Sequence, residues 1–168
     1  MASITKNYRD GVLKLQDGTS YTPNEITIPF VNANLTWSQK DEKIQVKDRG
    51  ALSHLREGDE EAIEGSFSCK FEEFYSDTNS GESPSAYEAF NQENEASAWV
   101  STNDDSGEVY TLTMIFEVTN PNTDGDNERI TFSKVYITSY DWADQEDPSS
   151  EITFNFVSFV TKPTIAKC

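Results

Sequence analysis

Apolar and polar residues alternate with period two along most of this chain, as they do in strands that bury one face. In residues 63–74, Phe67, Cys69 and Phe71 share one face, and Ser66 and Ser68 share the other. Residues 111–118 alternate in the same way. These two segments are the best strand predictions, and Cys69 is expected to be a small core residue.

The first third of the chain predicts four further strands. Their apolar positions are residues 12–15, 26–30, 35–37 and 44–46, separated by polar turns such as Asp17-Gly18. Because each strand follows the last after a short connection, we expect them to form a β meander.

Two later strands change phase partway. In residues 130–140, Ile130 and Phe132 give way to Val135, and in residues 152–160 Phe156 is followed directly by Val157. A strand cannot exchange its faces without a bulge, unless both faces are covered. Either the sheet bends at these points or a partner covers its second side.

One segment predicts a helix over residues 84–96. Ser85 stands three residues before Glu88, which is the spacing of a capping box, and Pro84 suits a helix entrance. Ala86, Tyr87 and Phe90 form a short apolar stripe that would pack on a sheet. We therefore expect a single mainly β domain over residues 1–168, with one flanking helix.

The charge balance narrows the possible functions. Thirteen basic residues stand against thirty acidic ones, giving a net charge of −17. Proteins grip nucleic acid with cations that displace counterions, so direct binding to a phosphate backbone is disfavoured. Solubility alone would also explain the acidity. Since no run approaches the ~20 apolar residues of a membrane span, we expect a soluble protein without membrane contact.

Catalytic machinery is sparse. His54 is the only histidine, and no nucleophile elbow, phosphate loop or dinucleotide fingerprint is present. Ser53 precedes His54, but neighbours in a strand point to opposite faces, so we expect no histidine triad. An acidic glycosidase stays open, because thirty acids offer too many candidate pairs. We therefore expect that the protein is not an enzyme.

No cofactor or metal is expected either. The turn at residues 124–128 has oxygen ligands for calcium but lacks the spacing of an EF-hand, so a solvated turn is favoured. Cys69 and Cys168 do not form a metal or redox spacing, and Cys168 is expected to be a free tail thiol.

The most unusual segment is residues 47–71, which joins a charged stretch to a strand. Asp48 and Arg49 before Gly50 predict a turn, and Leu52 and Leu55 suggest an apolar contact on a short irregular or helical piece. Such an arm suits docking on another surface, where leucines bury and charges set the register. A loop folded onto its own domain fits the pattern equally well.

At these residues the chain resembles the tail tube proteins of long-tailed bacteriophages. The resemblance rests on GVLKLQDGT at residues 11–19, on residues 34–71 with the DRG and LREGDE runs, and on AWVST and ITFSKVYITSYDW. It implies a β-sandwich or incomplete barrel with one flanking α-helix and a long extended hairpin loop. It also implies six copies in a ring, with rings stacked into a tube and adjacent subunits completing a sheet along the lumen.

In this resemblance the arm at residues 40–61 reaches the neighbouring ring. The residues expected to make that contact are Asp48, Arg49, Leu52, Leu55, Arg56, Glu57, Asp59 and Glu60. The implied partners are further copies, a tape measure protein, a terminator, a baseplate or tip, and a sheath in a contractile tail. DNA would pass through the lumen without specific binding, and the tail would be assembled in the host bacterial cytoplasm.

Two other functions stay open. One is a soluble β-sandwich module that binds carbohydrate, which is suggested by Trp37, Trp99, Trp142 and the many tyrosines. The tube of a contractile injection or secretion system is the other, because the tube fold is shared by such particles.

Overall fold

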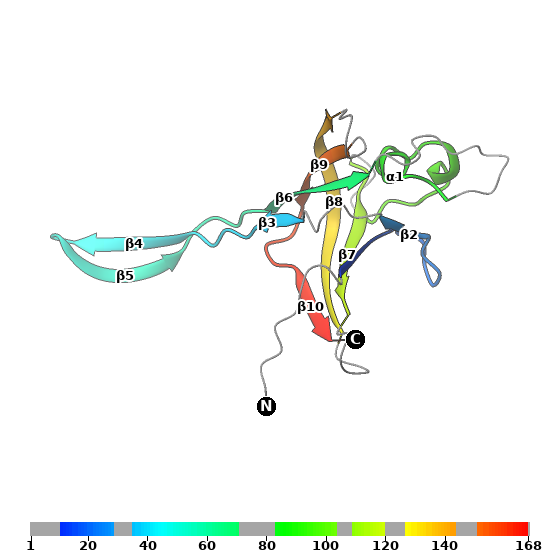
Figure 1. The fold of residues 1–168 in the computed structure, drawn as a ribbon. Helices are drawn as coiled ribbons and strands as arrows, with labels where there is room; N and C mark the ends of the chain where they lie inside the picture. The colour runs from blue at the N-terminus through cyan, green and yellow to red at the C-terminus, as the bar shows by residue number, and fades with distance from the viewer. Residues whose placement is uncertain are drawn as a thin grey trace.

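The computed structural model describes residues 11–28, 35–70, 83–103, 109–119, 127–143 and 151–167. It contains ten strands, one α-helix and one 3-10 turn within these residues (Figure 1). In chain order they are β1 (Gly11–Gln16), β2 (Glu25–Ile28), β3 (Thr36–Ser38), β4 (Lys43–Asp48), β5 (Ala51–Glu57), β6 (Ile63–Lys70), α1 (Ala86–Asn91), η2 (Asn94–Ala96), β7 (Leu112–Val118), β8 (Glu128–Ala143), β9 (Glu151–Ser158) and β10 (Thr164–Lys167).

Eight of the described strands form one antiparallel sheet in the order β2-β1-β7-β8-β9-β6-β3, with β10 paired to the first part of β8. β4 and β5 form a separate hairpin that projects from it (Figure 1). The mainly β class is thus confirmed. The expected early meander is wrong, because β3 pairs with β6 and lies at the opposite end of the sheet from β2. Alternation shows which face of a strand is buried, and it does not identify the pairing partner.

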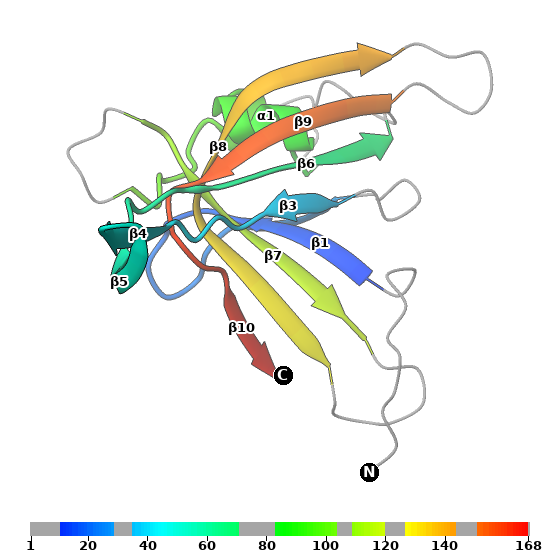
Figure 2. The same ribbon diagram turned by 90° about the vertical axis from the view of Figure 1, so that its left-hand side faces the viewer.

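The sheet curls around a single core. β3 lies three strands from β8 in the pairing order, so in a flat sheet the two would be about 14 Å apart. The rings of Trp37 on β3 and Phe132 on β8 nevertheless have centroids 5.4 Å apart. Figure 2 shows β8 passing from the half of the sheet with β1 and β7 into the half with β9 and β6. This shape agrees with the expected sandwich or incomplete barrel.

β8 contains a bulge, and it pairs with β7 in one half of the sheet and with β9 in the other. Phe132 pairs with Met114 and Val135 pairs with Leu112, so two residues of β8 lie opposite one of β7. One of the two, Lys134, has a φ of 50°. Phe132 and Val135 are both fully buried, although they stand three apart. The phase change in residues 130–140 is therefore a bulge, one of the two expected causes.

The second phase change has no bulge of its own in β9. Ile152, Phe154, Phe156 and Ser158 are buried in strict alternation. Phe159 follows the end of the strand and is 66% exposed. β9 itself therefore has no extra residue, although its ladder with β8 shifts register between Ile137 and Ser139, opposite Phe156 and Asn155. Coverage of this apolar surface by a partner remains a prediction.

The helix begins as expected and ends early. Ser85 Oγ accepts a hydrogen bond from the Glu88 backbone (3.3 Å), and the Glu88 carboxylate accepts one from the Ser85 backbone (2.9 Å), which confirms the capping box. Gln92 then adopts the left-handed conformation, so α1 has six residues and the three-residue η2 follows it. Asn94 Nδ2 donates to Glu88 Oε1 at 2.6 Å and ties η2 to the helix. Phe90 packs the helix onto the half of the sheet that contains Phe67 and Phe154.

The connection between β1 and β2 is held by Asp17, a buried carboxylate. It accepts hydrogen bonds from the backbone and side chain of Thr19, from the backbone and side chain of Asn24, and from the Val100 backbone. Burial raises the pKa of Asp17, but the hydrogen bonds from Thr19, Asn24 and Val100 together outweigh it, so the net pKa is lowered. The loop packs so closely that a Cβ on Gly18 would lie 2.3 Å from the Ser101 carbonyl oxygen.

Candidate assembly surface

The hairpin of β4 and β5, residues 43–57, forms most of the arm expected at residues 40–61, and from here on the name arm means this hairpin. Its turn consists of Arg49 and Gly50. Both residues have positive φ, 48° and 82°, between the paired residues Asp48 and Ala51. Two central residues of this kind are typical of a type I′ turn, whose twist matches that of the flanking strands. The turn predicted at these residues is confirmed.

A bulge in the arm places its two leucines on the same face. Leu52 pairs with Lys47 and Leu55 pairs with Gln45, and Ser53 is the extra residue between them. Because directly paired residues project to the same face, these four side chains form one surface, which we call the leucine face. The expected irregular or helical piece is wrong, since the segment is strand β5.

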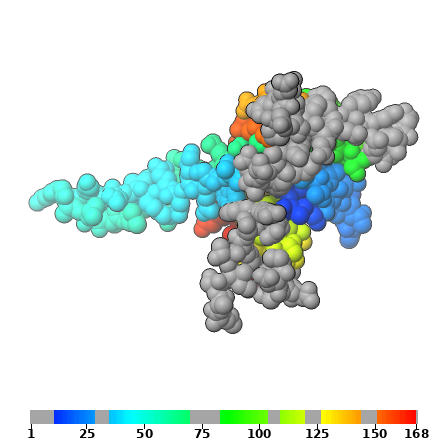
Figure 3. Space-filling view, in the orientation of Figure 1, coloured from blue at the N-terminus to red at the C-terminus, as the bar shows by residue number. Residues whose placement is uncertain are grey.

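The leucine face is open to solvent. Leu52 is 71% exposed and Leu55 is 64% exposed, and every residue of β5 is exposed. A shallow groove of about 310 Å³ runs over this surface, lined by Gln45 and residues 52–55. Figure 3 shows the arm standing clear of the rest of the chain. The alternative of a loop folded onto its own domain is therefore wrong, and an uncovered apolar surface of this kind is a candidate interaction site.

The arm also differs in charge from the chain that carries it. Residues 43–57 hold four basic and two acidic side chains, a net charge of +2, in a chain whose net charge is −17. The basic residues are Lys43, Lys47, Arg49 and Arg56. A basic arm on an acidic protein is electrostatically suited to contact another copy of the same protein.

Two segments, residues 39–42 and 58–62, connect the arm to the sheet, and we call them the neck. Polar contacts link the two segments. The Gly58 backbone donates to the Glu42 carbonyl (2.9 Å), and the Asp59 backbone donates to Glu42 Oε2 (3.0 Å). Lys40 forms an ion pair with Glu61 at 3.2 Å, and this hydrogen-bonded contact raises the pKa of Lys40. These contacts link the two segments of the neck.

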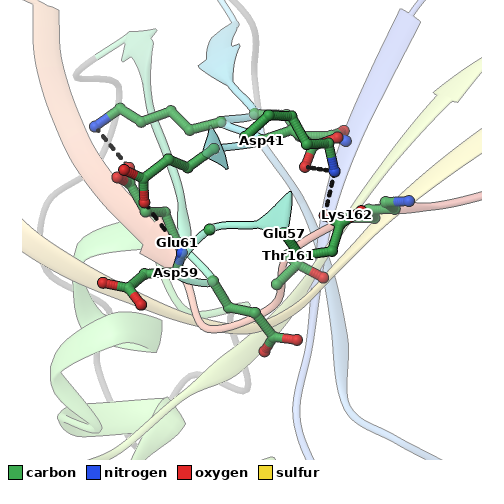
Figure 4. Close-up of a pocket in the computed structure, with 12 residues that line it drawn as sticks. Asp41, Glu57, Asp59, Glu61, Thr161 and Lys162 are labelled. Carbon is green, nitrogen blue, oxygen red and sulfur yellow. Dashed lines mark hydrogen bonds and ion pairs between the residues drawn. The ribbon is translucent and has the colours of Figure 1, made fainter. Parts of the chain in front are cut away.

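At the base of the arm, beside the neck, Lys43 bridges Asp41 (2.9 Å) and Glu57, and its contact with Glu57 raises the pKa of the lysine. The neck surrounds a polar space of about 430 Å³. Thr161 and Lys162 also line this space (Figure 4). One basic and five acidic residues give the neck a net charge of −4.

The eight residues expected to contact a neighbouring ring fall into two places. Six lie on the hairpin, namely Asp48, Arg49, Leu52, Leu55, Arg56 and Glu57. Asp59 and Glu60 lie in the neck, at the opposite end of the arm from its turn. The expected contact residues therefore run from the turn of the hairpin to its base at Glu57 and on into the neck, and their contact with a neighbouring ring stays a prediction.

A second exposed apolar surface lies beside the neck, and we call it the Phe159 ridge. Phe159 borders two grooves. One, of about 220 Å³, is lined by Asn103, Val109, Thr111, Lys134 and Tyr136, and the other, of about 360 Å³, by residues 60–62, Val160 and Thr161. Sequence analysis missed this surface as a site. Its signal was the unexplained phase change after Phe156.

The arm also contains the serine and histidine that sequence analysis considered for catalysis. The expectation that they point apart is wrong, because the bulge brings Ser53 Oγ within 3.0 Å of His54 Nδ1. Both side chains are exposed, and within the described residues no carboxylate hydrogen-bonds to this imidazole. The pair therefore lacks the third member of a triad.

The described parts of the chain contain no group of three His, Cys, Asp or Glu side chains arranged for a metal ion. Residues 124–126 of the turn considered for calcium lie outside them, as does Cys168. Cys69 is confirmed as a core residue, and burial raises the pKa of its thiol to about 12. No helix among the described residues is long and apolar enough to cross a membrane.

The tryptophans do not form a shared platform for a sugar. Trp99 is 5% exposed and belongs to the core, and Trp37 packs edge-on against Phe132. Trp142 is half-exposed and contacts Tyr87. The three indole rings therefore do not form one stacking surface.

No protein-family model and no curated protein matches the sequence. Solved structures with a similar fold were found over nearly the whole chain. One is a chain of the anti-feeding prophage cap, described as the AFP tube terminating cap, with 12% identity, a TM-score of 0.64, and coverage of 100% of this chain and 95% of that one. Another comes from the sheath/tube terminator of the extracellular contractile injection system PVC, with 10% identity, a TM-score of 0.62 and 99% coverage of both chains.

A third similar structure is a chain from the tail of an empty gene transfer agent particle. Its identity is 17%, its TM-score is 0.51, and the match covers 98% of this chain and 99% of that one. At such identities a likeness establishes the fold and not the role. This chain has the fold of proteins from the tails and tube terminators of phage-like and contractile particles, in agreement with its resemblance to phage tail tube proteins.

Proposed function

We propose that this protein is a tail tube subunit, which self-assembles into stacked hexameric rings that form a conduit for DNA. The observation that carries the proposal is the leucine face, held in solvent at the end of an arm that its own domain does not cover. Burial of such a surface against another copy is favourable because apolar area leaves water. The arm would then connect one ring to the next.

Sixfold symmetry is supported by two of the similar structures. The gene transfer agent tail is described with C6 symmetry, and a baseplate of the anti-feeding prophage, whose matching chain has a TM-score of 0.51, is described as 6-fold symmetrised. An arm that meets a different surface on the next copy makes a heterologous contact, which can propagate from subunit to subunit.

The partners and location follow from the same role. A tube subunit would contact a tape measure protein, a terminator and a baseplate or tip, with a sheath in a contractile tail. It would reside in the tail of the particle after assembly in the host bacterial cytoplasm. DNA would pass without specific binding, because acidic groups near the lumen repel it within roughly 8 Å at physiological salt.

The likeness to chains from two terminator structures, with TM-scores of 0.64 and 0.62, supports a second candidate, a tube terminator. The two functions differ in the assembly they require. A tube subunit stacks into tubes of many rings, whereas a terminator is needed as one cap at a tube end. Negative-stain microscopy of the concentrated wild-type protein therefore separates tubes from single rings.

The proposal is tested by replacing both Leu52 and Leu55 with Asp. The arm is exposed, so we expect an unchanged circular dichroism spectrum and melting temperature, together with at least a tenfold loss of tubes in sedimentation and microscopy. Ile165→Asp, at another exposed apolar side chain, is the control and should still assemble. Normal tubes from the double variant would overturn the role of the leucine face, and a strictly monomeric wild-type protein would overturn self-assembly itself.

A further inference from the structure

We propose that the leucine face of one copy docks on the Phe159 ridge of another copy. The inference rests on the proposed self-assembly, and it adds the surface that receives the leucine face. Both surfaces are apolar and exposed, and both lie outside the core of the described fold.

The spacing of the two leucines suits a surface that has two neighbouring grooves. The bulge at Ser53 sets Leu52 and Leu55 opposite Lys47 and Gln45, which are two residues apart on β4. The two leucines are therefore about 7 Å apart along the strand direction. On the receiving side, Phe159 lines both of two grooves. A pair of leucines at this spacing can straddle one ring, with one side chain in each groove.

On the neck side of Phe159 the charges of the two surfaces are opposite, whereas the groove on its other side is lined by Lys134. The leucine face carries Lys47, paired directly with Leu52, on an arm of net charge +2. The groove on the neck side of Phe159 is lined by Glu60 and Glu61, in a neck of net charge −4. Since Glu61 already pairs with Lys40, Glu60 is the better partner for an incoming lysine. Opposite charges at an otherwise apolar contact fix its register.

A copy cannot fill its own ridge with its own arm. Residues 60–62 line the groove and lie at the base of the arm. Leu52 lies six residues of extended chain from Gly58, about 20 Å away along the arm. Figure 1 shows the arm directed away from the sheet. The occupant must therefore be another copy, and because donor and receiver differ, each docked copy leaves a free arm or ridge for the next.

Cysteine crosslinking tests the contact directly. In a Cys168→Ser background, Leu52→Cys protein is mixed with Phe159→Cys protein and oxidised mildly, and we expect a covalent heterodimer on non-reducing gels. Cys69 is buried and should not interfere. Ile165→Cys replaces Phe159→Cys in the control, because Ile165 is 68% exposed against 66% for Phe159. A heterodimer no more abundant than in the control overturns the inference.

A charge exchange provides an independent readout of assembly. Lys47→Glu and Glu60→Lys should each reduce tube formation about tenfold, and the double variant should restore most of it. If wild-type tubes form and both single variants assemble normally, the docking is wrong while the proposed function stands. If wild-type protein forms neither tubes nor rings, the proposed function fails and this inference fails with it.

Discussion

At the scale of single residues, Asp17 shows how a buried charge can organise a loop. Its carboxylate accepts five hydrogen bonds, from Thr19, Asn24 and Val100, and thereby joins the loop after β1 to the segment that follows Trp99. Hydrogen bonds to an ionised acceptor are worth more than neutral ones. Sequence analysis identified only the Asp17-Gly18 turn, because the Val100 contact spans 83 residues.

Asp17→Asn should lower the free energy of unfolding by about 2 kcal/mol at pH 7, because charge-assisted hydrogen bonds are lost. The pKa of Asp17 is lowered in the folded state, so its stabilisation is complete above the unfolded pKa near 3.9 and is lost as pH falls through the folded value. The gap between wild type and variant should therefore narrow below about pH 4 in urea titrations. Asp48→Asn, on the exposed arm, should show no such gap, and a gap independent of pH would contradict the assignment.

At the scale of elements, the arm is a two-stranded hairpin whose own stability is marginal. Its turn and its neck are therefore what keep the leucine face in position. Gly50 has a φ of 82°, and a Cβ there would meet nothing within 4 Å. Any effect of a side chain at this position must come from backbone conformation alone.

Gly50→Val should strain the turn by about 1–2 kcal/mol, because side chains disfavour the left-handed region. Since the turn is remote from the core, we expect the melting temperature of the protein to be unchanged. Tube assembly, measured by light scattering, should slow severalfold. Ala51→Val adds the same side chain one residue later, in the strand, and is the control. Equal slowing by both variants would show that bulk matters and not the turn conformation.

The arm also shows how far sequence analysis reaches. The turn at Asp48-Arg49-Gly50 was predictable because few residues tolerate positive φ. The strand β5 was not, since Leu52 and Leu55 stand three apart and alternation cannot place them on one face without a bulge. The pairing of β3 with β6 was equally hidden. It depends on where the arm returns to the sheet, and Gly65 permits it, because a Cβ there would lie 2.3 Å from the Thr36 carbonyl oxygen.

At the scale of the whole molecule, the charge is unevenly distributed. One outward face of the sheet carries balanced charges, because Lys14 and Arg129 form ion pairs with Glu25 and Glu117. The neck is acidic and the arm is basic. Copies that each carry a net charge of −17 therefore repel one another at long range. At short range the basic arm of one copy is attracted to the acidic neck of another.

This arrangement predicts that salt speeds the assembly of the wild-type protein. Raising ionic strength from about 0.01 M to 0.1 M shortens the Debye length from about 30 Å to about 10 Å, which screens the long-range repulsion more than a contact between arm and neck. Light scattering at matched protein concentration measures the rate. Lys47→Glu and Lys167→Glu both change the net charge from −17 to −19, but only the first alters the leucine face. Lys167→Glu should therefore recover the wild-type rate at 0.1 M and Lys47→Glu should not, whereas recovery of both would show that net charge alone controls assembly.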